Sequence, residues 1–131
     1  MSRGPLPSEL CLLSSLPSRK IDDKVRFLGC VTAYSTTTAC ITLGHLYPRG
    51  TNVAVTVNVE LLLETLASEA TRTGEWVNVI GYVKGVVGRE AAAVQALMVW
   101  PAGPMDIQQY EAALDNVQGG GGGGGGAERS L

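Results

Sequence analysis

The sequence has few charged residues. Asp, Glu, Lys and Arg make up 17% of its 131 residues, against about 25% in an average soluble domain. Ten basic and twelve acidic residues give a formal net charge of −2, which excludes a strongly basic protein that wraps nucleic acid by releasing many counterions. A small local cationic patch is still compatible with this balance. So little charge indicates that part of the surface is reserved for a partner.

Cysteine and histidine are also scarce. Cys11, Cys30 and Cys40 stand at unrelated spacings without a Cys-x-x-Cys pair, and His45 is the single histidine. Structural zinc sites normally use four such ligands, and disulfide scaffolds use paired cysteines in an oxidising compartment. We therefore expect no metal site, no disulfide and no cofactor. The cysteines are expected to be small buried hydrophobes, and His45 a rim or partly buried histidine with a hydrogen bond.

Long hydrophobic runs and catalytic motifs are absent. The run Leu10–Leu13 is too short for a signal peptide, and no segment reaches the roughly 18 apolar residues of a membrane span. We expect a soluble intracellular protein. No Gly-x-Ser-x-Gly motif accompanies His45, and Gly81–Gly88 matches no phosphate-binding loop. The sequence therefore predicts a protein that is not an enzyme.

Hydrophobic residues, 45% of the chain, alternate in the manner of β-strands. Gly29 indicates a bulge or bend in the first strand. Leucines at helical spacing predict a helix over residues 60–70, which Asn58 could cap. The pattern predicts five strands, over residues 24–34, 39–43, 51–59, 76–83 and 91–100.

The two ends differ from this middle part. Residues 1–21 are expected to form an N-terminal strap, and residues 22–117 the folded domain. A closing helix is predicted over residues 105–117. Eight consecutive glycines predict a disordered tail over residues 118–131, because such a segment cannot bury enough apolar surface to offset its backbone entropy.

Three strands, a helix, two strands and a closing helix are the order of the OB-fold, an all-β, five-stranded Greek-key barrel. A generic β-rich α+β domain is the alternative. OB-folds bind oligomers on their second and third strands, but the outward positions there hold neither an aromatic nor a charged residue. Candidate nucleic-acid contacts lie at the edges of this face, and each could equally be a solvated charge or a half-buried ring. They are Arg26, Tyr34, Tyr47, Arg49, Lys84 and Arg89.

The closing helix carries a stronger signal for a partner. Ile107, Tyr110, Leu114 and Val117 recur at helical spacing and could pack on the barrel. The opposite sides carry small or soft residues rather than charged ones: Met105, Ala112 and Ala113. Such a helix can pack on its own barrel with one side and on a partner helix with another. The alternative is a helix that only plugs its own barrel. We expect the helix to bury only part of its circumference within the chain.

Three segments together resemble the fungal Ten-one family, the smallest subunit of the CST (Cdc-thirteen, Stn-one, Ten-one) telomere-capping complex. They are Lys24–Tyr34, Gly74–Val83 and Val94–Trp100, followed by the helix with Tyr110. The resemblance extends from about Leu6 to Leu114, and its specificity lies in the order and spacing of the segments rather than in a single motif.

This resemblance implies a non-enzymatic OB-fold protein in the nucleus, at chromosome ends, that pairs directly with a Stn-one-type subunit. The resemblance further implies that the protein contacts a Cdc-thirteen-type or other large subunit through the complex. The resemblance also implies telomere capping, length regulation and a weak contact with single-stranded telomeric DNA. The rival interpretation is a stand-alone protein that binds single-stranded nucleic acid. On this chain, the implied partner-binding residues are Met105, Ile107, Tyr110, Leu114 and Trp100.

Overall fold

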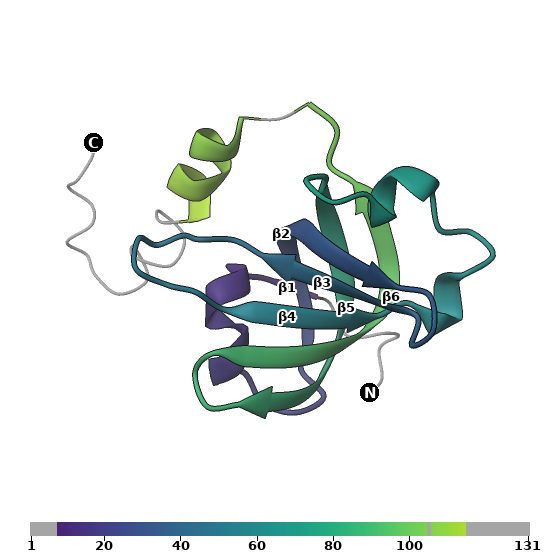
Figure 1. Ribbon diagram of the computed structural model, residues 1–131. Helices are drawn as coiled ribbons and strands as arrows, with labels where there is room; N and C mark the ends of the chain where they lie inside the picture. Colours follow the sequence, from purple (N-terminus) through teal and green to yellow (C-terminus); the bar gives the residue numbers. More distant parts are fainter. Residues whose placement is uncertain (1–7, 105, 115–131) are drawn as a thin grey trace, which may run out of the picture.

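The computed structural model of the chain describes residues 8–104 and 106–114 (Figure 1). Its strands are β1 (Glu9–Leu10), β2 (Lys24–Ser35), β3 (Cys40–Gly44), β4 (Ala54–Asn58), β5 (Trp76–Val87) and β6 (Ala91–Pro101). Three short 3-10 helices accompany them: η1 (Leu13–Ser18), η2 (Glu60–Leu62) and η3 (Ser68–Thr71). An α-helix is described over residues 107–114.

The strands close into a barrel. They are ordered β1-β2-β3-β4-β6-β5, and β5 also pairs with β2. The long strand β2 makes this closure possible, because its first half pairs with β5 and its second half with β3. A bulge between Val31 and Ala33 bends β2 at the change of partner. The predicted OB-fold is confirmed.

Gly29 allows close packing on β2 and is not the point at which the strand bends. The irregularity in β2 follows it by two residues, whereas a Cβ atom at Gly29 would lie 2.8 Å from Leu13 Cδ1 and 2.9 Å from Leu43 Cβ. The missing side chain therefore lets η1 approach the barrel wall closely.

Alternation along the strands separates core from surface as expected. In and beside β4, Val53, Val55, Val57 and Val59 are buried. They join a core cluster that includes Phe27 and residues of every strand from β2 to β6. The N-terminal segment contributes as well, because Cys11, Leu13 and Leu16 are fully buried in the same cluster. Cys30 and Cys40 are only half-buried, so the expectation that all three cysteines are buried is wrong.

The prediction of one continuous helix over residues 60–70 is wrong. The segment forms the two short 3-10 helices η2 and η3, and Asn58 Oδ1 accepts a hydrogen bond of 2.9 Å from the Glu60 amide. Leu62 and Leu66 pack against the core, while Leu61 and Leu63 are exposed. Packing on the barrel decides this conformation over helical propensity.

The hairpin between β5 and β6 is longer than expected. The strand continues to Val87, which pairs with Ala91 where the sequence predicted a loop from Lys84. None of the helices among residues 8–104 and 106–114 is long and apolar enough to cross a membrane. The predicted tail, Met105 and the beginning of the strap lie outside the described residues.

Candidate interaction site at the C-terminal helix

The described helix begins with a capping aspartate. Asp106 Oδ1 accepts hydrogen bonds from the backbone amides of Gln108 (3.0 Å) and Gln109 (3.2 Å), and its carbonyl accepts one from the Tyr110 amide (3.1 Å). The two side-chain bonds satisfy amides that have no partner within the helix, and the bond from Tyr110 is the first helical bond. The cap thus fixes where the helix starts.

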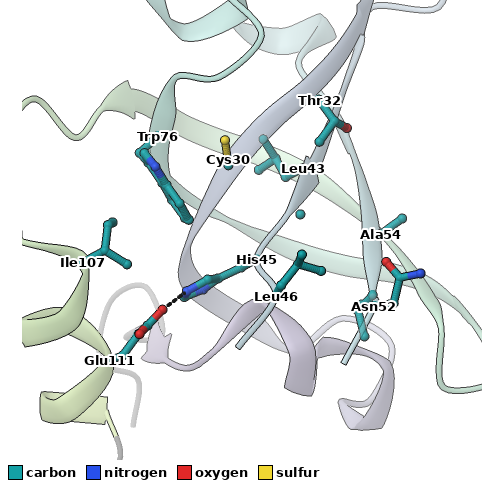
Figure 2. Close-up of a pocket in the computed structure, with 12 residues that line it drawn as sticks. Cys30, Thr32, Leu43, His45, Leu46, Asn52, Ala54, Trp76, Ile107 and Glu111 are labelled. Atoms are coloured by element: carbon teal, nitrogen blue, oxygen red, sulfur yellow. Dashed lines mark hydrogen bonds and ion pairs between the residues drawn. The ribbon is translucent and has the colours of Figure 1, made fainter. Parts of the chain in front are cut away.

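A buried histidine joins the helix to the barrel. His45, just after β3, is 3% exposed, and its Nε2 lies 2.8 Å from Glu111 Oε2 (Figure 2). The rings of Trp76, Tyr47 and Tyr110 surround it at centroid distances of 5.2, 6.0 and 6.2 Å. The expected hydrogen bond is confirmed, but the histidine is almost fully buried where the sequence predicted a rim or partly buried one. Its partner, Glu111, carried no sequence signal because the two residues meet only in the folded chain.

Two polar atoms at this junction are buried and find no hydrogen-bond partner within the described part of the chain. They are His45 Nδ1 and Tyr110 Oη. Burial raises the pKa of Tyr110 to about 12, because the phenolate would lose its hydration. The backbone of Leu28 offsets part of this rise. This junction therefore has more buried polar atoms without hydrogen bonds than is usual in a protein core.

One side of the helix packs inward and another faces solvent. Leu114 is 1% exposed and Tyr110 is half-buried, whereas the opposite side is exposed. That open side consists of Gln108, Gln109, Ala112 and Ala113. The described helix therefore buries only part of its circumference. The predicted partner contacts Tyr110 and Leu114 lie on the inner side of the described helix.

A hollow lies between the helix and the barrel wall. Its volume is about 650 Å³, and residues of β2, β3, β4, β5 and the helix line it (Figure 2). Ile107 and Glu111 face it from the helix, and Trp76 faces it from the start of β5. The sequence did not single out Trp76, which begins a strand predicted to be apolar on both faces. Trp100, a predicted partner contact, instead lines a smaller groove with Leu62, Leu66 and Met98.

The candidate nucleic-acid residues do not gather in one groove. Tyr34 packs partly buried against the core, and Arg26 is exposed on β2. Tyr47 and Arg49 lie in the β3–β4 connection, and Arg89 lies in the β5–β6 turn.

Lys84 already has partners within the chain. Its Nζ makes an ion pair of 2.8 Å with Asp22 and lies 5.8 Å from the centroid of the Tyr82 ring. Both charged side chains are more than half exposed, so the pair is weak. It nonetheless offsets part of the cationic charge that a phosphate would meet. Among the described residues, no group of three or more His, Cys, Asp or Glu could hold a metal ion.

Comparison with known proteins adds a family and a fold. The family model Ten1 (Ten-one), described as a telomere-capping CST complex subunit, matches residues 1–115. The S. pombe Stn1–Ten1 complex contains a similar chain, with a TM-score of 0.69 and 23% identity over 88% of this chain and 96% of that one. S. pombe Ten1 alone gives the same TM-score and identity over 86% and 99%.

A third solved structure widens the fold comparison. U. maydis replication protein A bound to single-stranded DNA matches with a TM-score of 0.60 and 14% identity, over 87% of this chain and 94% of that one. At these identities the structural likeness shows the shared OB-fold. No curated protein sequence matches the chain.

Proposed function

The chain belongs to the Ten1 family of telomere-capping CST complex subunits, and from that premise we propose that it pairs with a Stn1-type subunit through the open side of its C-terminal helix. As a member of this family it is a structural subunit and not an enzyme. The pair would act in the nucleus, at the single-stranded ends of telomeres, and a large Cdc-thirteen-type subunit would join it through the complex.

The observation that carries this proposal is the one-sided docking of the helix. Glu111 and Leu114 hold it on the barrel, while Gln108, Gln109, Ala112 and Ala113 are exposed. None of these four exposed side chains is charged, and the two alanines allow another helix to approach closely. A side of this composition suits a helix–helix contact better than permanent exposure to water.

Contact with single-stranded DNA would be a minor part of this function. The outward faces of β3 and β4 carry no aromatic side chain on which bases could stack. Arg49 and Arg89 are exposed near the ends of these strands and could add salt-sensitive phosphate contacts to a groove formed mainly by the partner. The likeness to replication protein A supports a fold that accommodates such a contact.

Charge placed on the open side of the helix tests the proposal. We expect Ala112→Arg with Ala113→Arg to weaken binding of the Stn1-type subunit by about a hundredfold, because two desolvated charges would oppose the contact. Isothermal titration with the purified partner measures this affinity. Ala93→Arg, on an exposed position of β6, is the matched control. Equal affinities for the wild type, the double variant and the control would refute pairing through this helix.

A further inference from the structure

The hollow beside the helix has a floor of small residues arranged in one row across the barrel. In the strand register, Cys30 of β2 lies opposite Trp76 of β5 on one side and Gly44 of β3 on the other. Gly44 in turn lies opposite Ala54 of β4. We call the space above this row, which the Trp76 ring closes at one end, the trough. A large outward side chain at Gly44 or Ala54 would fill it.

The trough is open, not packed. A Cβ atom built on Gly44 meets one neighbouring atom within 4 Å, Thr32 Cγ2 at 3.9 Å. The walls are formed by Trp76, by Ile107 of the helix and by Leu46, which is 71% exposed (Figure 2). At about 650 Å³ the space falls within the range of roughly 300–1,000 Å³ typical of ligand clefts.

The chemistry of the lining selects a neutral, apolar occupant. His45 and Glu111 are hydrogen-bonded to each other. Burial, and to a smaller extent the nearby negative charge of Glu75, raises the pKa of the Cys30 thiol and keeps the thiol neutral. Neither lysine nor arginine is among the described residues that line the hollow. A phosphate-bearing ligand would therefore meet the Glu111 carboxylate without a compensating cation, which disfavours nucleic acid here.

We infer that the trough receives an apolar side chain of the Stn1-type partner, aliphatic or aromatic, which anchors the pair beside the helix. This inference rests on the proposed function, because the helix supplies both surfaces. Ile107 and Glu111 form one wall of the trough, on the side of the helix opposite its open side, so a partner that fills the trough and also packs on the open side would hold the helix from two sides. A buried apolar anchor in a preformed pocket is the usual form of a binding hot spot.

Filling the trough tests the inference. Gly44→Val places two methyl groups in open space, so we expect the barrel to fold and the affinity for the Stn1-type subunit to fall at least about tenfold. Gly85→Val, on β5 with no atom within 4 Å of its added Cβ, is the matched control and should bind normally. Ala54→Ile fills the same trough from β4 and keeps the test valid if Gly44→Val does not fold.

A second measurement needs no filling variant. In wild-type chain labelled with fluorotryptophan, the ¹⁹F resonance of Trp76 should shift when the partner is added to saturation, because the occupant lies against its ring. Assignment by Trp76→Phe separates this resonance from that of Trp100. An unshifted Trp76 resonance at saturation would overturn the inference.

The outcomes separate the inference from the proposed function. If both filling variants bind normally while the Ala112→Arg, Ala113→Arg double variant does not, the partner uses the helix alone and the inference is wrong. If all of these variants bind normally, the proposed function fails as well. If the filling variants leave partner affinity unchanged but weaken binding of a single-stranded telomeric oligonucleotide, the trough holds a base and the inference is again wrong.

Discussion

Two buried polar atoms, His45 Nδ1 and Tyr110 Oη, lie where the helix meets the barrel and have no hydrogen-bond partner among the described residues. A buried hydroxyl that makes no hydrogen bond costs free energy that the folded state must offset elsewhere. The His45–Glu111 contact of 2.8 Å and the packing of Trp76 against His45 offset this cost. At the residue scale, specific contacts therefore hold the helix on the barrel.

Replacing Tyr110 by Phe keeps the ring and removes the unpaired hydroxyl. At neutral pH we expect the free energy of unfolding to stay equal or rise by about 1 kcal/mol, measured by urea denaturation. Because the pKa of Tyr110 is raised from 10.0 to about 12 in the folded chain, folding favours the neutral phenol. The contribution of the buried neutral phenol to the free energy of unfolding is complete below pH 10 and is lost as the pH rises through about 12.

The wild type should therefore lose stability relative to Tyr110→Phe over this alkaline range, and the other tyrosines, common to both chains, serve as the internal control. Parallel stability profiles from pH 9 to about 12 would show that the Tyr110 hydroxyl is not buried.

The helix is the element that links the barrel to its proposed partner, and it is described over eight residues, 107–114. The Asp106 cap at its beginning and the Glu111 and Leu114 contacts along its inner side stabilise it. A partner that packs on the open side would stabilise the same element from the opposite direction.

Removing the cap tests this dependence. We expect Asp106→Ala to destabilise the helix by about 1 kcal/mol, because the amides of Gln108 and Gln109 lose their acceptor, whereas Asp106→Asn retains a capping oxygen. Hydrogen exchange of the amides in residues 107–114 reports this, with faster exchange in the alanine variant only. The same exchange rates in wild type and both variants would mean that packing alone holds the helix.

Periodicity is enough to predict most elements of this fold but not how they meet. The alternating valines Val53 to Val59 predicted β4, since period-two burial is a local property of a strand. The spacing of Leu62, Leu63 and Leu66 misled the prediction of a helix, because Leu62 and Leu66 contact the core while Leu63 is exposed. Local pattern determines the strands, and tertiary packing determines the connections.

The candidate site depended even more on tertiary structure. His45 and Glu111 are 66 positions apart, and the trough needs the register that sets Gly44 beside Cys30 and Ala54. Side-chain type predicted a helix with small outward residues, which the described part confirms. It assigned Tyr110 and Leu114 to the partner, although both lie on the inner side of the helix in this structure.

At the scale of the whole molecule, one barrel presents its features on one side. Figure 1 shows the helix beside the β3–β4 connection, where His45 contacts it. The trough lies at the same place; of the four cationic candidates, Arg49 lies in that connection, and Arg26, Lys84 and Arg89 lie on other elements. This distribution, in a member of the Ten1 family, suits a subunit whose main task is to pair with another protein.

Thiol labelling at the open side of the helix tests this account most directly. In an Ala113→Cys chain, peptide-resolved mass spectrometry follows maleimide modification of the new cysteine, with half-buried Cys40 as the reference within the same molecule. We expect rapid labelling in the free chain and labelling at least about tenfold slower once the Stn1-type subunit is bound, with no change at Cys40. An unchanged labelling rate at position 113 in a complex that has formed would contradict the central claim.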